Sequence, residues 1–245
     1  MKKNRRFHFN SITVGGMVLI GVAVVLFIAS EFFKLPQVQQ WYEQYDHIMV
    51  NFEEYIVNLP NKAGIFLIIM LLFFIKALLP FPIYPISFLC VLTSVVYNVY
   101  LSLLINTLGL VILFCAKYVW GKRLGSGFAG RVLPRYKKAW GIVEHNGNGN
   151  PWLLVGLRAV PSFPINAVSG LYGSLDFGFG KYILLSVLGF IPKLTFYTII
   201  GRNVFDPLSS AFILPIAILI LFSGVSMISI NMIVDAINRK TNQQS

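Results

Sequence analysis

Residues 76–87 read KALLPFPIYPIS, and residues 158–169 read RAVPSFPINAVS. At an offset of 82 residues, the two stretches share a cation, an alanine, a Phe-Pro-Ile triplet and a final serine. Both interrupt apolar sequence with prolines, and a helix cannot continue through such a cluster because proline lacks a backbone donor and clashes with the preceding turn. The match predicts an internal repeat, each copy of which contains a broken helical hairpin.

The composition around these stretches is that of an integral membrane protein. Of 245 residues, 56% are hydrophobic and 12% are charged, which is about half the charged share of a soluble domain. The net charge of +11 does not indicate nucleic acid, because the basic residues flank apolar segments, where they act as orientation signals. We therefore expect membrane lipids as partners and no nucleic acid, and a homo-oligomer is left open.

Four apolar segments are long enough to cross a bilayer as helices: residues 12–30, 100–120, 181–200 and 211–234. The first is predicted to be a signal anchor and not a cleaved signal peptide, because its apolar run is long and no small-x-small site follows it. Between Pro36 and Pro60, apolar residues recur at helical spacing. This segment is expected to be an amphipathic helix that caps the bundle or lies on the membrane.

The proline-containing segments are short for a full span on either side of the break. Broken backbone at membrane depth is tolerated only where protein or a wet cavity surrounds it. Residues 63–98 and 151–180 are therefore predicted to be re-entrant hairpins, with full crossing as the alternative. The predicted organisation has three parts: an N-terminal part (1–62), a core (63–205) and a C-terminal part (206–245). The core consists of repeat one (63–120), a basic loop (121–150) and repeat two (151–200).

The basic residues predict the orientation of the chain. Twelve of the 20 lie in residues 1–11, in residues 121–150 and in the C-terminal tail, whereas three lie in residues 31–62 and 202–208. By the positive-inside rule, both termini and the basic loop are cytoplasmic, in a multi-pass protein of the cell (plasma) membrane. The two hairpins then enter from opposite sides, so the repeats are inverted, which is a transporter architecture.

Lys76 and Arg158 occupy equivalent places in the two repeats. A cation at the bilayer centre costs about 2.5–3.5 kcal/mol on insertion scales, so it usually faces a cavity or a partner. Residues 55–143 contain no acid, and Asp176 is the acid nearest to Arg158 in its own half. Arg158 is predicted to bind an anion such as a lipid phosphate, because its planar fork matches phosphate. The alternative is a structural arginine bonded to hairpin carbonyls.

Other candidate residues surround these two cations. Lys193 is either a site residue or a snorkelling one, and Lys117 and Lys181 are expected to snorkel. Asn166 is expected to bond either headgroup oxygens or a hairpin carbonyl. Gly170 and Gly173 are expected to allow two helices to approach closely, in preference to contacting a ligand. The candidate substrate-binding residues are Arg158, Lys76, Asn166, Pro161, Pro164, Pro82, Gly170, Gly173, Asp176 and Lys193.

The sequence holds no motif for catalysis. There is no Walker loop, His-Glu-x-x-His motif or nucleophile elbow, and the three histidines lie outside the apolar runs. Cys90 and Cys115 lie within apolar runs and are expected to be buried small hydrophobes. We therefore expect no enzymatic activity, no metal and no cofactor.

The segment LRAVPSFPINAVSGLYGSLDFGFGKYILLSVLGFIPKLTFYTIIG (157–201), with the earlier proline hairpin, resembles the DedA/VTT superfamily, also called the SNARE-associated Golgi protein family. It looks most like the bacterial Tvp-like branch. The resemblance covers about residues 60–205 and rests on Arg-x-x-Pro-x-x-Pro-x-Asn at 158–166, with Gly-x-x-Pro at 189–192. It implies two re-entrant hairpins in an inverted repeat and movement of lipid between leaflets, with Arg158 matching the first motif arginine.

The chain departs from the DedA subgroup at two points. Pro164 stands where that subgroup has a second arginine, and the first hairpin region lacks the acids that the subgroup carries there. We predict a lipid translocase or scramblase that moves an anionic, phosphate-bearing lipid, such as a phospholipid or undecaprenyl phosphate. The alternatives are an ion- or proton-coupled transporter of a small solute and a non-transporting membrane scaffold, and the missing acids disfavour proton coupling.

Overall fold

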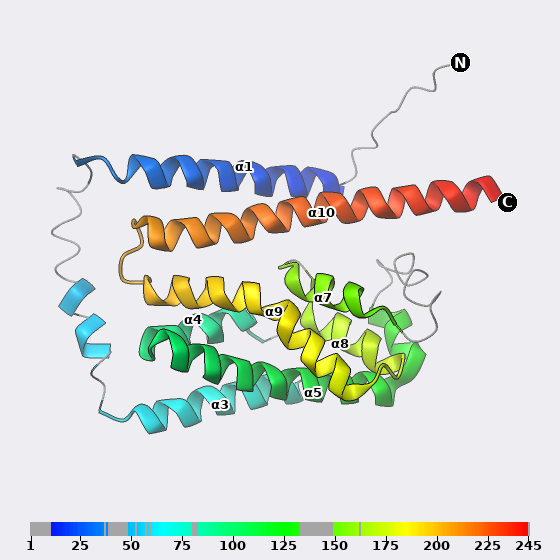
Figure 1. Cartoon of the computed structure of the whole chain (residues 1–245), viewed down its shortest axis with the longest axis horizontal. Coiled ribbons are helices and arrows are strands. Elements are labelled where there is room, and N and C mark those ends of the chain that lie inside the picture. Colours follow the sequence, from blue (N-terminus) through cyan, green and yellow to red (C-terminus); the bar gives the residue numbers. More distant parts are fainter. Residues whose placement is uncertain are drawn as a thin grey trace, which may run out of the picture.

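The computed structural model describes residues 11–36, 38, 49–51, 53–56, 58, 60–79, 83–132, 149–161 and 163–244. Most of the expected amphipathic helix, residues 1–10, residues 133–148 and Pro82 lie outside the described residues. In the described part, the regular elements are the helices α1 (Ser11–Phe32), α3 (Lys62–Leu78), α4 (Ile86–Val96), α5 (Val99–Val132), α7 (Pro151–Ala159), α8 (Ile165–Ser174), α9 (Phe179–Arg202) and α10 (Ser210–Gln244) (Figure 1).

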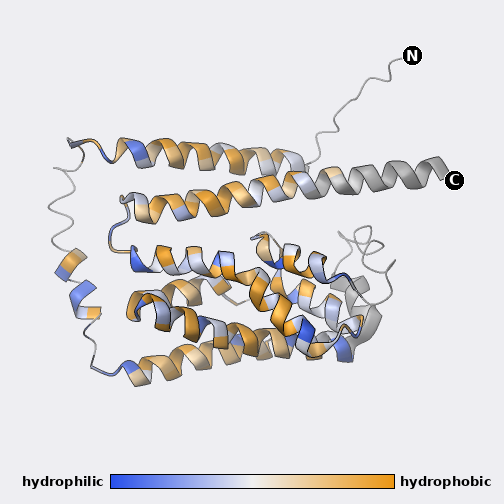
Figure 2. Cartoon of the chain, in the orientation of Figure 1, coloured by the Kyte–Doolittle hydropathy of each residue, from blue (hydrophilic) through white to orange (hydrophobic). Residues whose placement is uncertain are grey.

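Four of these helices contain a segment that is long and apolar enough to cross a membrane: Thr13–Phe32, Val99–Arg123, Phe179–Arg202 and Ser210–Ser229. They coincide with the four spans predicted from hydropathy. Large apolar side chains such as Val25, Ile28 and Leu184 are exposed on them, as expected for surfaces that face lipid. Apolar residues recur along α1 and the first part of α10 (Figure 2). The protein is therefore an all-helical, multi-pass membrane protein, as predicted.

Two long helices extend beyond the predicted spans. α5 continues to Val132, so the first part of the predicted basic loop is helical, and α10 continues to Gln244. The apolar span within α5 is Val99–Arg123, close to the predicted 100–120, so the helix continues past the span into the predicted basic loop.

Both hairpins are re-entrant. The Tyr97 hydroxyl, directly after α4, donates to the carbonyl of Lys62 at the start of α3, at 2.5 Å. The Tyr172 hydroxyl, near the end of α8, donates to the carbonyl of Asn150 at the start of α7, at 2.7 Å. Each hairpin thus leaves at the end of the molecule where it entered, and the lengths of its helices distinguish a re-entrant hairpin from two full spans.

Three of the four hairpin helices are too short to cross a bilayer. α4, α7 and α8 have 11, 9 and 10 residues, or about 14–17 Å at the helical rise of 1.5 Å per residue, roughly half the hydrocarbon core of a bilayer. α3 is longer, with 17 residues, but each hairpin contains at least one helix that is too short, so both are re-entrant. α7 begins where the Asn150 side chain accepts from the Trp152 amide at 2.9 Å, with Pro151 in the first turn. Pro85 and Pro164, both in extended conformation, precede the first residues of α4 and α8.

The two repeats exchange their hairpin helices. In each repeat, the first hairpin helix packs on its own spanning helix, α3 on α5 and α7 on α9. The second hairpin helix packs on the spanning helix of the other repeat, α4 on α9 and α8 on α5. This reciprocal pattern confirms the internal repeat and interlocks its two copies.

Four glycines mark the equivalent crossings. A Cβ at Gly109 would meet the Phe73 ring of α3, and one at Gly189 would meet the Val155 backbone of α7. A Cβ at Gly121 would lie 2.4 Å from the carbonyl oxygen of Gly170 on α8. A Cβ at Gly201 would lie 2.5 Å from the carbonyl oxygen of Val91 on α4. Both glycine pairs are 80 residues apart, so the spanning helices correspond at an offset of 80.

The offset of 82 found in the sequence therefore holds only before the breaks. Residues 79–85 separate α3 from α4, whereas only residues 160–164 separate α7 from α8. Because α4 and α8 begin 79 residues apart, at Ile86 and Ile165, the structural counterpart of Pro164 is Pro85 and not Pro82. In the same way, at the offset of 80 the counterpart of the buried Tyr182 is the buried Ser102, whereas Tyr100, which lies 82 residues before Tyr182, is 86% exposed.

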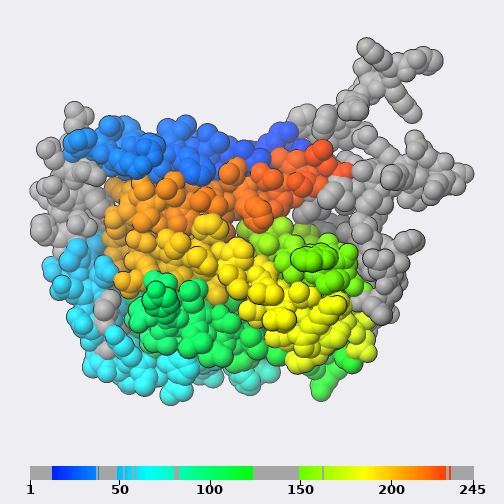
Figure 3. All heavy atoms as spheres, viewed as in Figure 1, coloured from blue at the N-terminus to red at the C-terminus, as the bar shows by residue number. Residues whose placement is uncertain are grey.

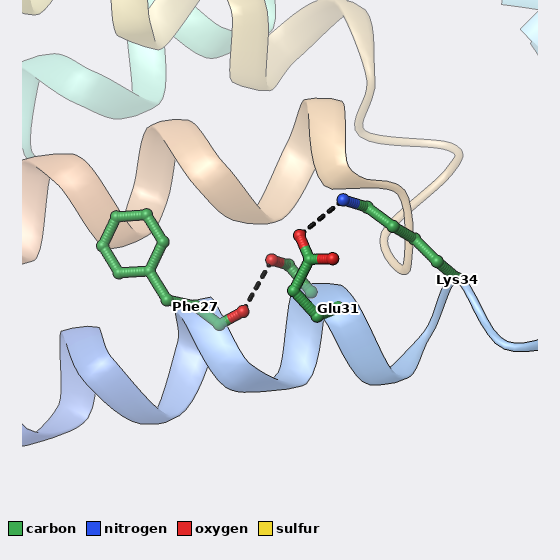
Figure 4. A network of polar contacts seen from close by, with 4 residues as sticks. Phe27, Glu31 and Lys34 are labelled. Carbon is green, nitrogen blue, oxygen red and sulfur yellow. Dashed lines mark hydrogen bonds and ion pairs between the residues drawn. The ribbon is translucent and has the colours of Figure 1, made fainter.

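Helices α1 and α10 run side by side along one edge of the molecule, and α10 joins this pair to α9 (Figure 3). They approach closely, because a Cβ on Gly16 would lie 2.9 Å from the carbonyl oxygen of Gly224. At the end of α1, an exposed Glu31–Lys34 ion pair of 2.5 Å forms within one helical turn (Figure 4). Such a surface pair contributes little stability.

The start of α1 and the ends of α5 and α10 lie at one end of the molecule, and the connection between α9 and α10 lies at the other (Figure 1). This is the arrangement that the predicted topology requires. Which end is cytoplasmic stays a prediction.

Candidate functional site

A cavity of about 210 Å³ lies where the two hairpin breaks meet. Its walls come from both breaks and from the spanning helices α5 and α9. The lining residues are Lys76, Tyr84, Pro85, Ile86, Leu113, Pro161, Phe163, Pro164, Ile165, Asn166, Phe190, Lys193 and Tyr197. The structural counterparts Pro85 and Pro164, and Ile86 and Ile165, all line this cavity at the junction of the repeats.

The cavity confirms that the hairpin breaks converge. Tyr84 and Asn166, which lie 82 residues apart, line the same space. Sites at the interface of inverted repeats, built from broken helices, are typical of transporters. The breaks therefore place polar backbone and side chains at the place where such a site is expected.

Lys76 lies in the wall contributed by the first hairpin. Its ammonium donates to the carbonyl of Tyr84, across the break, and lies 4.8 Å from the centroid of the Tyr84 ring. The Tyr84 hydroxyl in turn donates to the carbonyl of Leu72 at 2.5 Å. Lys76 thus links the end of α3 to the chain that enters α4 and contributes a positive charge to the cavity.

Lys193 lies in the wall contributed by α9 and is only 4% exposed, so it does not snorkel. Its ammonium donates to the carbonyl of Val160, the C-cap residue of α7, at 3.2 Å and lies 4.3 Å from the centroid of the Phe190 ring. A cation is stabilised at a helix C-terminus by the unpaired carbonyls and the helix dipole. Lys193 therefore lies in the cavity wall, and its contact with a substrate stays a prediction.

Lys117 has the same role in the first repeat. It is 5% exposed, and its ammonium donates to the carbonyl of Leu79, the C-cap residue of α3. The expectation that it snorkels was wrong, because α5 does not end near Trp120 and Lys117 faces the hairpin. Lys181, at the start of α9, is exposed as expected. A lysine on each spanning helix therefore caps a hairpin helix.

Arg158 lies behind the cavity wall, 1% exposed. Its Nη2 donates to the hydroxyls of Ser169 and Tyr182, both at 2.7 Å, its Nη1 to the carbonyl of Ile165 at 3.3 Å and its Nε to the hydroxyl of Ser186 at 3.3 Å. These contacts are those of the structural alternative, an arginine that holds the second break together. Because Ile165 lines the cavity, Arg158 positions the wall, and its direct contact with a headgroup stays a prediction.

Asp176 is not the partner of Arg158. It forms an exposed ion pair with Lys122 at 2.6 Å, and its positive φ of 52° turns the chain after α8. Among the described residues, the ion pairs are Lys122–Asp176 and Glu31–Lys34. Within that part of the chain, the cations at the breaks therefore have no carboxylate partner.

The remaining predicted residues divide into two groups. Pro161, Pro164 and Asn166 line the cavity, and no hydrogen bond ties the Asn166 amide to another described side chain. Gly170 and Gly173 lie at the crossing of α8 and α5, where a Cβ on Gly173 would be 2.3 Å from the carbonyl oxygen of Tyr118. The glycines therefore serve close helix approach, as predicted.

Sequence reasoning missed Tyr182 and Ser186, which hold Arg158, and Tyr197 in the cavity wall. A signal existed for the first two. They lie four residues apart within an apolar span and thus on one helix face, where buried polar groups usually have partners. Nothing in the pattern marks Tyr197 as a cavity residue.

The comparisons with known proteins agree with this architecture. The family model of the VTT domain matches residues 81–203, half of the chain, from the first break to the end of α9. No curated protein and no solved structure matched the chain. By the match of the family model, the chain belongs to the VTT domain family, within the DedA/SNARE-associated superfamily.

Proposed function

We propose that this protein moves a phosphate-bearing, anionic lipid, such as a phospholipid or undecaprenyl phosphate, between the two leaflets of the cell membrane. The observation that carries the proposal is the cavity between the two breaks, which contains Lys76, Lys193 and Asn166 and no acidic lining residue among those described. Membership in the bacterial Tvp-like branch and cytoplasmic termini belong to the same proposal.

The physical argument starts from the cost of the buried cations. Lysines at membrane depth are unfavourable unless they meet a cavity or an opposite charge, and the described cavity supplies no carboxylate. A phosphate supplies the missing charge and accepts strong charge-assisted hydrogen bonds. The acyl chains of the lipid can stay in the bilayer while the headgroup passes the breaks.

The two-fold arrangement supports movement in both directions. Each break contributes its own proline and isoleucine to the cavity, and a lysine caps each first hairpin helix. A headgroup from either leaflet therefore meets a similar wall. A proton-coupled transporter is the weaker candidate, because proton relays in membranes usually contain acidic residues or histidines, and the described lining residues include neither.

Reconstitution tests the proposal. The purified protein is inserted into liposomes with a trace of tail-labelled phosphatidylglycerol, and the label that a reductant added outside can reach is followed over time. We expect the protein to expose the inner-leaflet label without an ion gradient, and Lys193→Met to slow this about tenfold, which corresponds to the loss of one charge-assisted hydrogen bond of about 1.4 kcal/mol.

Lys181→Met is the matched control, because Lys181 lies on the same helix but is exposed and outside the cavity wall; it should keep the full rate. Protein-containing vesicles that behave like empty ones would contradict the proposal and favour a scaffold. Movement that requires an ion gradient would instead indicate a coupled transporter.

A further inference from the structure

We infer that the cavity selects headgroups that carry net negative charge and no amine, so that zwitterionic headgroups move much more slowly than anionic ones. This inference rests on the proposed function, because the headgroup has to enter the cavity. The chemistry that it names, a phosphate without an attached ammonium, occurs both in lipid headgroups and in free phosphate esters.

The charges around the cavity are all of one sign. Lys76 and Lys193 line it. Directly behind the wall, Lys117 binds the carbonyl at residue 79 and Arg158 binds the carbonyl at residue 165. The described lining residues include no carboxylate, so the field inside the cavity attracts a phosphate and repels an ammonium.

Several groups that could bind an ammonium are already occupied by the two lysines. Ammonium ions are bound by carbonyl oxygens or by the faces of aromatic rings. In this cavity, the carbonyls of Tyr84 and Val160 accept from Lys76 and Lys193. The same two ammonium groups cover the rings of Tyr84 and Phe190, at 4.8 and 4.3 Å from the ring centroids. A headgroup amine therefore has to compete with the two lysines for these carbonyls and rings.

Donors for a phosphate remain available. An ammonium group has three donors, and the described hydrogen bonds of Lys76 and Lys193 each use one. The Asn166 amide adds two more donors on the opposite break. The volume of about 210 Å³ is below the range of pockets for drug-sized ligands, so the cavity fits a small headgroup such as phosphate with glycerol.

The test compares headgroups within one preparation. Liposomes of phosphatidylcholine carry traces of tail-labelled phosphatidylglycerol, phosphatidic acid, phosphatidylethanolamine or phosphatidylcholine, and the rate of leaflet exchange is measured for each. We expect the two anionic lipids to exchange at least tenfold faster than the two zwitterionic ones. The ratio of rates does not depend on how much of the protein has folded.

Reversing the charge at Lys76 provides a second test of the selectivity. Lys76 is half-buried, so Lys76→Glu can be accommodated, and it places a carboxylate in the cavity that attracts an amine and repels phosphate. We expect the ratio of anionic to zwitterionic rates to fall at least tenfold, and Lys76→Gln to lie in between. Lys181→Glu, outside the cavity, should leave the ratio unchanged.

The outcomes separate this inference from the proposed function. Equal rates for all four headgroups, or an unchanged ratio in Lys76→Glu, would overturn the selectivity while lipid movement stands. Efflux of entrapped glycerol 3-phosphate without lipid movement would support anion selection, assign it to a free phosphate ester and overturn the proposed lipid function. No movement of either would overturn both.

Discussion

Arg158 shows how one buried side chain can organise a break in the membrane. A guanidinium without a carboxylate partner is costly to bury unless its donors are satisfied. Here three hydroxyls, of Ser169, Tyr182 and Ser186, and one backbone carbonyl accept from it. The planar fork of arginine serves these acceptors at once, which the single ammonium group of lysine cannot do.

We therefore predict that Arg158→Ala abolishes lipid movement and lowers the free energy of unfolding by about 3 kcal/mol, because the buried hydroxyls lose a charged partner. Arg158→Lys should keep part of the activity. Tyr182→Phe, which removes a single acceptor, should cost about 1 kcal/mol. Thermal unfolding in detergent measures the change in stability, and leaflet exchange of labelled lipid measures the activity. A stable, fully active Arg158→Ala protein would show that this network is dispensable.

At the scale of the elements, the interlocking of the repeats depends on glycines at the helix crossings. The close approach of α5 and α8 leaves no space for a Cβ at Gly173, whose nearest neighbour is a backbone atom that cannot move independently of its helix. Gly156 on α7 offers a matched comparison, because nothing lies within 4 Å of the place of its Cβ.

Gly173→Ala is expected to push α8 away from α5 and to lower the thermal midpoint strongly, by an overpacking cost of about 1–3 kcal/mol. Gly156→Ala should be neutral or stabilising by up to about 1 kcal/mol, because alanine is the better helix former. Melting curves of the two variants in detergent test this prediction. Similar midpoints for both variants would mean that α5 and α8 pack less closely than described.

The sequence predicted much at this scale. Hydropathy located the four spans, and the prolines located both breaks, because these signals are local. The register of the repeat was wrong after the breaks, since an ungapped match cannot reveal that the second break is two residues shorter. Lys117 was misjudged because the end of the apolar run was taken as the end of its helix, whereas α5 continues to Val132.

At the scale of the whole molecule, the exchange of α4 and α8 between the repeats could not be predicted. Helical periodicity shows that a face is apolar and does not show which neighbour covers it. The cavity depends on this exchange, because it brings residues of both breaks and Lys193 together. The orientation in the membrane, in contrast, was predicted from basic residues alone.

That orientation is testable with cysteines at the two ends of the molecule. In a Cys90→Ala/Cys115→Ala background, Lys122→Cys should be protected from an impermeant maleimide added outside cells, whereas Arg202→Cys should react. Both positions are exposed, so accessibility depends on the side of the membrane. Reaction of both from outside, or of Lys122→Cys alone, would contradict the positive-inside assignment.

The central claim is that the headgroup passes through the cavity between the two breaks. In the same cysteine-free background, Tyr84→Cys and Asn166→Cys place thiols on opposite walls of that cavity. The most direct measurement is leaflet exchange of labelled phosphatidylglycerol before and after these cysteines are joined by a short, cleavable crosslinker. We predict that crosslinking stops exchange and that cleavage restores it, whereas an unchanged rate in fully crosslinked protein would show that the lipid takes another path.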